Sequence, residues 1–209
     1  MEDKNQHYYS KFPDTQVQIF TISESLRRHL FIFKTITGVF SFKKIDLGTK
    51  TLIENMVIPH EPGTFLDLGC GYGVIGIVLS YISPRSLVYF IDINKRAIWC
   101  ARENINLNLI NSKKNAITLS GNYFEPIQGK NIIFDEIYMN PPLRQGRKDF
   151  LKVVEEVQDF LKINGSFQFV IRKKMGAPYI FEYLRDNYPD NHVEIICKRS
   201  GYWVFRFFR

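Results

Sequence analysis

Residues 64–76 read Thr-Phe-Leu-Asp-Leu-Gly-Cys-Gly-Tyr-Gly-Val-Ile-Gly, and the fold prediction is built outward from this stretch. Its first five residues predict a short buried strand, and the apolar residues that follow, to about residue 82, predict a helix. The glycines between them, Gly69, Gly71 and Gly73, permit a sharp turn and a close approach of the backbone to a ligand. Free N–H groups at the start of the following helix add to such a site. The stretch therefore predicts a strand–loop–helix unit that binds a ligand.

Beyond this unit, strand-like segments alternate with segments of helical periodicity, which predicts an α/β fold with a doubly wound, mostly parallel sheet. Asn94 is expected to cap the next helix, and a helix over 149–161 is expected to end at a left-handed cap at Asn164-Gly165. The last two strands have no helix between them, so only an antiparallel hairpin can join them. The predicted strands are 64–68, 87–91, 115–119, one within 132–139, 166–171, 193–197 and 202–207.

Residues 1–60 are expected to form an extension to a main domain that spans 61–209. Aromatic and β-branched residues on both sides of Gly38, within 31–42, predict a short hairpin, and residues 49–57 have helical spacing. Aromatic side chains, Phe40 among them, are interleaved with basic ones from Tyr8 to Lys44. This pattern suits bases of RNA that stack beside a basic surface, and it equally suits a hairpin that packs its rings inward.

The composition is that of a globular protein, since 45% of the 209 residues are hydrophobic and 23% are charged. The longest apolar run, 74–82, is far shorter than the roughly 20 residues of a membrane-spanning helix, so no membrane association is expected. Residues 1–12 carry no apolar signal core. The scattered cysteines, Cys70, Cys100 and Cys197, predict free thiols in a reducing cytoplasm, and neither they nor the histidines have the spacing of a metal site.

The formal net charge is +7, and it is unevenly distributed. Residues 1–60 hold 8 basic and 6 acidic side chains, residues 61–142 hold 7 of each, and residues 143–209 hold 13 and 8. A polyanionic partner such as nucleic acid explains a basic excess at the two ends, and so does general solubility. Composition alone leaves both explanations open.

The glycine loop itself has two interpretations. Gly71-x-Gly73-x-x-Gly76 matches the dinucleotide fingerprint of nicotinamide and flavin oxidoreductases. Asp67, just before the loop, instead suits a ligand with an ammonium group, such as the methionine part of S-adenosylmethionine, because a carboxylate repels a pyrophosphate. Asp92 ends the next predicted strand, where a carboxylate can accept hydrogen bonds from both hydroxyls of a ribose.

Asn140-Pro141-Pro142 follows the strand predicted within 132–139, at the carboxyl edge where open α/β sheets bind ligands. The two prolines fix φ and remove two N–H donors. The Asn140 side-chain oxygen and the Pro141 carbonyl oxygen can then both accept hydrogen bonds from one planar NH2 group. Holding both N–H bonds favours a tetrahedral nitrogen, whose lone pair can aim at the methyl carbon of a sulfonium. A rigid turn is the structural alternative, whereas a dehydrogenase has no need of this motif.

With these motifs the chain resembles the class I S-adenosylmethionine-dependent methyltransferases, whose sheet has seven strands with the last one antiparallel. More narrowly, it resembles the methyltransferase small domain group, which includes the C-type enzymes that methylate guanine N2 in 16S ribosomal RNA and their single-domain archaeal relatives. The resemblance covers nearly the whole chain. It is carried by 67–73, Asp92 and Asn140-Pro141-Pro142-Leu143-Arg144-x-Gly146, and by 7–10, 38–41 and Asp46-x-Gly48-Thr49.

The resemblance implies a role for each matching residue. Those expected at the cofactor are Gly48, Thr49, Asp67, Gly69, Cys70, Gly71, Tyr72, Gly73, Asp92, Ile93 and Asn122. Asn140, Pro141 and Pro142 are expected to hold the target amine. The residues expected at the substrate are Phe40, Leu143, Arg144, Arg172, Lys173 and Lys174. Asn122 stands where the family usually has an acid that reads the adenine amine, and Leu143 stands where many members have an aromatic ring.

The function expected from the resemblance is methyl transfer from S-adenosylmethionine to guanine N2 of small-subunit ribosomal RNA, on naked RNA or on the small ribosomal subunit. A tRNA guanine or adenine amine is the alternative target. A nicotinamide-dependent oxidoreductase and a non-catalytic RNA-binding or assembly protein are the alternatives of other classes.

Overall fold

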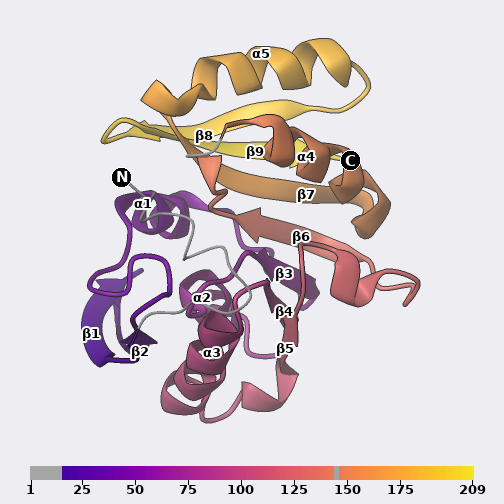
Figure 1. Ribbon diagram of the computed structural model, residues 1–209. Helices are drawn as coiled ribbons and strands as arrows, with labels where there is room; N and C mark the ends of the chain where they lie inside the picture. Colours follow the sequence, from indigo (N-terminus) through magenta and orange to yellow (C-terminus); the bar gives the residue numbers. More distant parts are fainter. Residues whose placement is uncertain (1–15, 144–145) are drawn as a thin grey trace.

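The computed structural model describes residues 16–143 and 146–209, and its centre is a seven-stranded sheet (Figure 1). The strand order is β5-β4-β3-β6-β7-β9-β8. The strands β3 to β7 run parallel, and β9 is antiparallel to both of its neighbours. This confirms the predicted doubly wound sheet with a reversed last strand. The strands are β3 (Thr64–Leu68), β4 (Leu87–Asp92), β5 (Ala116–Ser120), β6 (Phe134–Met139), β7 (Leu161–Arg172), β8 (Val193–Arg199) and β9 (Tyr202–Phe208).

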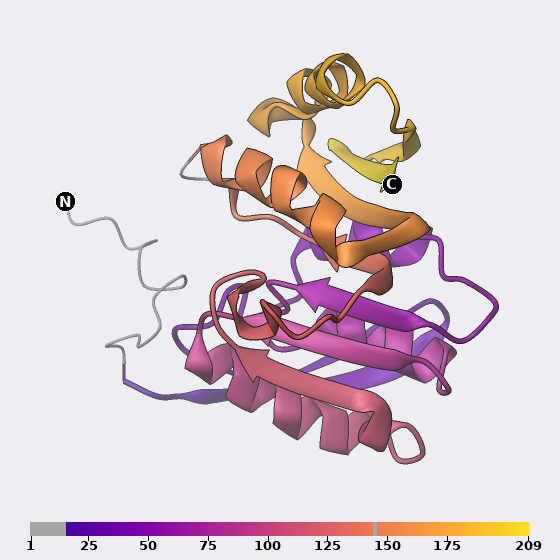
Figure 2. The same ribbon diagram turned by 90° about the vertical axis from the view of Figure 1, so that its right-hand side faces the viewer.

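Helices cover both faces of the sheet, and Figure 2 shows α3 and α4 on opposite sides of the strands. Strand β6 shows how the faces are divided: Tyr138 points into the core on the α1–α3 side, while Ile137 and Met139 point into the core beneath α4 and α5. The helices are α1 (Leu47–Asn55), α2 (Val74–Ile82), α3 (Lys95–Asn108), α4 (Lys148–Phe160) and α5 (Ala177–Asn187). Asn94 caps α3 as predicted, because its side chain accepts from the N–H groups of Arg96 and Ala97.

The N-terminal hairpin consists of β1 (Ile19–Leu26) and β2 (His29–Ile36), joined at Arg27 and Arg28. The hairpin predicted around Gly38 is therefore wrong, because the aromatic segment is the second strand of the pair and its partner precedes it. The partner strand is mostly polar along its outward face. For this reason β1 lacks the aromatic pattern from which the hairpin was predicted.

The turn of the hairpin also lacks the usual sequence signal. Arg27 and Arg28 have φ of 48° and 67°, a left-handed pair for which Asn-Gly is typical. Tertiary bonds hold Arg27 in this conformation: its N–H donates to Glu54 Oε1 at 2.8 Å and its Nε donates to Ile53 O at 2.6 Å. The end of α1 thus fixes a turn that local propensity does not predict.

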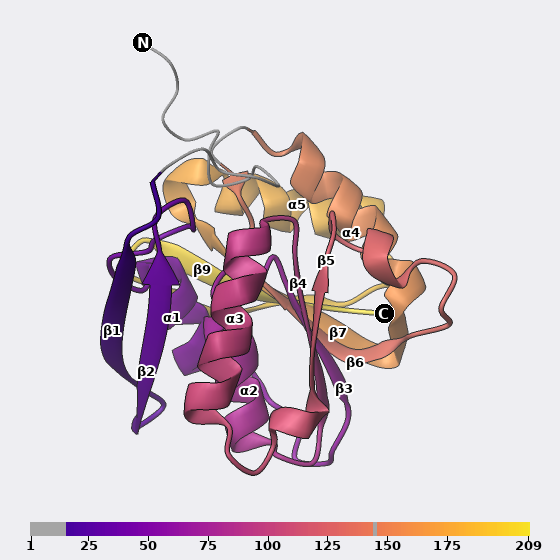
Figure 3. The same cartoon turned by 60° about the horizontal axis from the view of Figure 1, so that its bottom comes forward.

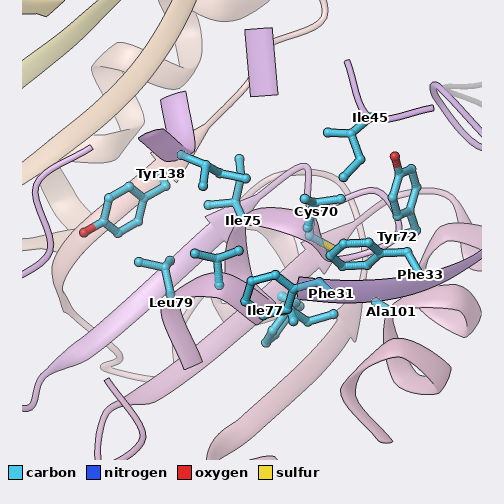
Figure 4. Close-up of a cluster of buried hydrophobic side chains, with 14 of the residues drawn as sticks. Phe31, Phe33, Ile45, Cys70, Tyr72, Ile75, Ile77, Leu79, Ala101 and Tyr138 are labelled. Carbon is cyan, nitrogen blue, oxygen red and sulfur yellow. The ribbon is translucent and has the colours of Figure 1, made fainter. Parts of the chain in front are cut away.

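The hairpin lies beside α3 (Figure 3), and its aromatic residues pack inward against α2 and α3, as Figure 4 shows for Phe31 and Phe33. Phe31 and Phe33 are buried, and the Phe33 ring lies 5.9 Å from the ring of Tyr72. These two side chains therefore belong to the core, which answers the open question for them. Tyr8, Tyr9, Lys11 and Phe12 lie outside the described residues.

Two asparagines of α3 pair with the free edge of β2. Asn104 Oδ1 accepts from Lys34 N at 2.6 Å and its Nδ2 donates to Lys34 O at 2.9 Å; Asn108 makes the same pair of bonds with Ile32 at 3.1 and 2.8 Å. The Nδ2 of Asn104 also donates to Tyr72 O at 2.9 Å. Side-chain amides thus replace a neighbouring strand, and Asn104 connects the hairpin to the glycine loop.

Helix α4 does not reach the predicted left-handed cap. It ends at Phe160 and the chain enters β7 directly at Leu161. Asn164 does have a left-handed φ of 66°, but it lies within β7, at an irregularity of the pairing between β6 and β7. An irregular stretch of a strand can take the same left-handed Asn as a helix end, so the pattern identified the backbone conformation and not the element.

Candidate functional site

A cavity of about 550 Å³ lies at the carboxyl ends of β3, β4, β5 and β6. The chain reaches it from three sides: the glycine loop and strand ends form its floor, the segment after β2 forms one wall, and α4 forms another. Of the residues predicted for the site, those that line it are Phe40, Thr49, Gly69, Cys70, Gly71, Tyr72, Asp92, Ile93, Asn122, Asn140, Pro141 and Pro142. Asp46 and Asn94 line it too. The fold therefore brings together most of the predicted site.

The glycine loop owes its shape to backbone conformation. Gly69, Gly71 and Gly73 have φ of 72°, 55° and 90°, a region that side chains other than glycine rarely tolerate. A Cβ at Gly69 or Gly71 would meet nothing within 4 Å, so the open side of the loop faces space where a ligand can approach. Gly76 has another reason: a Cβ there would lie 2.3 Å from the Phe90 ring. That glycine permits α2 to pack closely on the sheet.

Asp92 binds the glycine loop to the end of β4. Its Oδ2 accepts from Gly71 N and its Oδ1 accepts from Asn94 N, both at 2.8 Å. Burial raises the pKa of Asp92 to about 6, although these two bonds oppose the shift. Each carboxylate oxygen can accept a further hydrogen bond, and Asp92 lines the cavity. It can therefore receive hydroxyl groups from a ligand.

Asp67 lies beneath the loop and not in the cavity wall. It is fully buried, and its Oδ2 accepts from Gly76 N at 2.8 Å. Its Oδ1 has no hydrogen-bond partner among the described residues, and burial raises the pKa of Asp67 to about 7. A carboxylate at this place repels a pyrophosphate. This arrangement disfavours a dinucleotide.

Asn140 follows β6 and is held from the N-terminal part of the chain. Its Nδ2 donates to Asp46 Oδ2 at 3.1 Å and to Thr49 Oγ1 at 2.8 Å. No described residue donates to its Oδ1. The Pro141 carbonyl accepts from Leu143 N at 3.0 Å, and its second lone pair can accept another donor. The turn thus offers acceptors to the cavity, and sequence analysis missed that Asp46 supports them.

Other predicted residues lie away from the cavity. Gly48 and Gly73 do not line it, and Leu143 is buried in the core with Phe150. Arg144 lies outside the described residues. The predictions also missed the acidic side chains of α4 that line the cavity, Asp149 and Glu156. Burial raises the pKa of the Cys70 thiol well above its usual range, so this cysteine is a packed loop residue.

The basic triplet Arg172, Lys173 and Lys174 stands outside the cavity, at the carboxyl end of β7 and fully on the surface. The tip of the β8–β9 hairpin lies beside it: Tyr202 pairs with Arg172 on one side and with Arg199 on the other. Lys198 covers the ring of Trp203 at 4.1 Å. Within the described chain, none of the cations at 172–174 and 198–199 forms an ion pair with a carboxylate.

Among the described residues, no group of three or more His, Cys, Asp or Glu side chains could hold a metal ion. No helix in the described ranges, 16–143 and 146–209, has the length and hydropathy to cross a membrane.

The chain has clear relatives. The family model for the methyltransferase small domain matches residues 30–206. The uncharacterized protein YbxB of Bacillus subtilis (strain 168) is 34% identical over 202 residues, which cover 97% of this chain and 98% of the relative. Ribosomal RNA small subunit methyltransferase C of Buchnera aphidicola is 28% identical over 197 residues, 91% of this chain and 54% of that enzyme. This chain therefore spans about half the length of the second relative.

Among solved structures, the T. thermophilus 16S rRNA N2 methyltransferase in complex with AdoMet and guanosine has a TM-score of 0.74. The match covers 94% of this chain and 52% of that one, at 18% identity. A ribosomal protein L11 methylase of Lactobacillus delbrueckii subsp. bulgaricus has a TM-score of 0.63 at 19% identity, over 79% and 83% of the two chains. At these identities the likeness concerns the fold.

Proposed function

This chain belongs to the methyltransferase small domain family, and we propose that it transfers a methyl group to an exocyclic amine of a base in RNA. Family and fold make it a class I S-adenosylmethionine-dependent methyltransferase. This assignment replaces the nicotinamide alternative, which also conflicts with the charge of Asp67 at the start of α2. The target amine, the RNA and the residue roles are our proposals.

The residues present fit S-adenosylmethionine. Gly69 and Gly71 leave open space on the loop where side chains would intrude, and Asp92 can receive the ribose hydroxyls. The unpartnered oxygen of Asp67 places a buried negative charge behind the loop, which favours a ligand that carries an ammonium group. Asn122 follows β5 in the cavity wall, where its side chain can bond the adenine amine. When bound, the cofactor supplies the electrophilic methyl group.

The observation that carries the proposed reaction is the orientation of Asn140. With its NH2 group turned to Asp46 and Thr49, its Oδ1 is left to accept from a target amine, and Pro141 O is the second acceptor. Two such bonds hold the amine nitrogen in place and favour the tetrahedral geometry needed for in-line transfer. No strong base is required beforehand, because the nitrogen loses its proton readily only after it is methylated.

RNA is supported as the substrate by the basic surface, by which we mean Arg172, Lys173, Lys174, Lys198 and Arg199. These cations lie at the same edge of the sheet as Asn140, without described carboxylate partners, and can contact phosphates. Small-subunit ribosomal RNA is the favoured substrate because the relative from Buchnera aphidicola is named a small-subunit ribosomal RNA methyltransferase. Guanine N2 is the favoured amine because the similar T. thermophilus structure is that of a 16S rRNA N2 methyltransferase with guanosine bound. A tRNA amine is the runner-up.

The described cysteines are free thiols, and we place the enzyme in the cytoplasm.

The test is transfer of a tritiated methyl group from the cofactor to purified 30S particles, ribosomal RNA and tRNA. Label in the 30S particle or its RNA, located at guanine N2 by mass spectrometry, is the expected result. Label in tRNA alone would move the proposal to the runner-up. If no nucleic acid is labelled although calorimetry shows cofactor binding, RNA methylation is rejected.

A pair of charge reversals tests the basic surface. Lys198→Glu with Arg199→Glu should raise KM for the RNA at least tenfold and leave the Kd of the cofactor unchanged. Lys113→Glu with Lys114→Glu is the matched control. It makes the same change of charge just before the amino end of β5, at the edge of the sheet opposite to the cavity. Equal effects of both pairs would show that only net charge matters, and would remove the basic surface from the proposal.

A further inference from the structure

The Asp46 carboxylate and the Asn140 side chain face each other across the entrance of α1. Their contact joins Asp46 Oδ2 to Asn140 Nδ2 at 3.1 Å, and Thr49 Oγ1 lies 2.8 Å from the same nitrogen. Nothing in the sequence connects these residues, since 94 positions separate Asp46 from Asn140. We infer that Asp46 is a positioning residue, an inference that rests on the proposed function. Asp46 fixes the Asn140 amide with its oxygen toward the cavity, and so restricts the target to a hydrogen-bond donor.

Electrostatics decides which end of the Asn140 amide faces Asp46. An ionised carboxylate only accepts hydrogen bonds, whereas the Thr49 hydroxyl can donate or accept. Thr49 alone would therefore tolerate either orientation of the Asn140 amide. A flipped amide would bring two oxygens to the separation at which the nitrogen now donates, and would exchange an attraction for a repulsion. Asp46 is thus the group that decides the orientation.

Asp46 cannot turn away from Asn140 without cost, because it also caps α1. The same Oδ2 accepts from Gly48 N at 2.8 Å and from Thr49 N at 3.2 Å. A Cβ on Gly48 would lie 2.8 Å from that oxygen and 2.9 Å from the Tyr202 ring. Glycine at 48 therefore permits the close approach, which gives this residue a role although it does not line the cavity.

The exit of α1 is held by the strands that flank Asn140. Gln168 of β7 accepts from Val57 N and donates to Val57 O, each at 2.8 Å, and the Tyr138 hydroxyl of β6 donates to Val57 O at 2.8 Å. Helix α1 is thus held at both ends: Tyr138 of β6 contacts its exit, and Asn140, which follows β6, contacts its entrance. The carboxylate of Asp46 is presented by a fixed helix and not by a free loop.

A consequence for specificity follows. With its nitrogen occupied, Asn140 offers the cavity an acceptor, and Pro141 O offers another. Amino groups of guanine, adenine and cytosine satisfy both, whereas the carbonyl oxygens of uracil would face them without a hydrogen bond. An unmatched polar pair of this kind is rejected far more strongly than a difference in size. Asp46 lines the cavity as well, and it selects the chemical class of the target through the orientation that it gives to Asn140.

The test uses two substitutions of Asp46 that differ in reach. Asp46→Ser keeps a good helix cap but is one bond too short for Asn140, and should lower kcat about 10–100-fold with the cofactor Kd within twofold. Asp46→Asn can place its Oδ1 where Oδ2 now accepts, and should restore most of the rate. Asn55→Ala is the control for loosening of α1, because it removes only the bond from Nδ2 to Thr51 O; its kcat should change less than threefold.

A double-mutant cycle separates positioning from other roles. In an Asn140→Ala background, Asp46→Ser should cost no further rate, because it acts only through that amide. If the losses of rate from the two substitutions multiply, the inference is overturned. It is also overturned if the kcat of Asp46→Asn does not exceed that of Asp46→Ser.

A second readout does not need an RNA substrate. The side-chain NH2 signals of Asn140, assigned by their loss in Asn140→Ala, should exchange slowly with solvent in the wild type and in Asp46→Asn. They should exchange at least tenfold faster in Asp46→Ser. Unchanged exchange in Asp46→Ser would overturn the inference even for an enzyme that labels no RNA, whereas failure of the proposed function would appear only in the transfer assay.

Discussion

The glycine-loop half of the cavity and the Asn140 half are assembled in opposite ways. In the first, the bonds join residues that are near in the chain: Gly76 and Asp67 are nine positions apart, and Gly71 and Asp92 are 21 apart. In the second, the partners of Asn140 lie 94 and 91 positions away. The first half is therefore a local motif, and the second depends on how the N-terminal segment docks on the sheet.

The two halves should therefore respond to different substitutions. Substitutions in the loop should act on cofactor affinity, whereas substitutions that disturb α1 or the end of β6 should act on the transfer step. The formal charges of residues 61–142, which include the glycine loop and Asn140, sum to zero, and the basic excess lies on both sides of them.

The largest effect is expected from Asn140→Ala. Loss of a preorganised group at the reacting atoms should slow single-turnover methyl transfer about 100–1,000-fold, while calorimetry shows cofactor affinity within twofold. Asn187→Ala removes an exposed amide far from the cavity and serves as the control. An unchanged transfer rate in Asn140→Ala would place the reaction elsewhere in the molecule.

The next largest effect is expected from salt concentration, which should change the affinity for RNA much more than the affinity for the cofactor. Five phosphate contacts with single-stranded RNA predict about a 100-fold loss of RNA affinity between 50 and 200 mM salt. The cofactor pocket gains little from long-range charge, so its Kd should shift less than threefold over the same range. Filter binding and calorimetry measure the two constants. Equal salt dependence of the two constants would contradict the assignment of RNA binding to the basic surface.

Asp92→Asn should act on the cofactor alone. It removes the charge that strengthens hydrogen bonds to two hydroxyls, which is worth about 1.5–3 kcal/mol, and cofactor affinity should fall roughly 10–100-fold. The rate at saturating cofactor should stay within threefold of the wild type. A large drop in that rate with intact affinity would mean that the two halves are coupled.

The pH dependence of stability concerns the glycine-loop half alone. Burial raises the pKa of Asp67 to about 7 and that of Asp92 to about 6, so the folded chain binds protons that the unfolded chain has already lost. The free energy of unfolding of the ligand-free protein should therefore fall as pH rises from about 4 to about 7. Asp67→Asn should reduce this slope and raise the melting temperature at pH 8, while it weakens cofactor binding. Denaturation across this pH range measures it; a slope equal to that of the wild type would contradict the burial of this charge.

The local half was predictable because its signals are local. Glycines with positive φ, an acid before the loop and an acid at the next strand end follow from backbone rules within a few residues. The same holds for the cap at Asn94 and for the reversed last strand, which the short connection at Gly201 requires.

The remaining features rest on tertiary contacts that leave no periodic trace. Arg27 turns the hairpin because α1 supplies its hydrogen bonds, and Asp46 meets Asn140 only after α1 has docked. Leu143 matches the position of a stacking residue in the motif, yet the fold buries it in the core beside Phe150. A motif thus predicted which residue types assemble, and packing decided which of them reach the cavity.

The bonds of Asn104 bear on how such a chain can be altered by evolution or by engineering. One amide serves Lys34 of the hairpin and Tyr72 of the loop, so the hairpin is no interchangeable module. A hairpin grafted from a relative must place the backbone carbonyl of its second strand where that of Lys34 now lies. Otherwise Asn104 loses the bond that helps to orient its amide toward Tyr72 of the loop. Recombination between family members should therefore succeed when the hairpin and α3 are exchanged as one inherited unit.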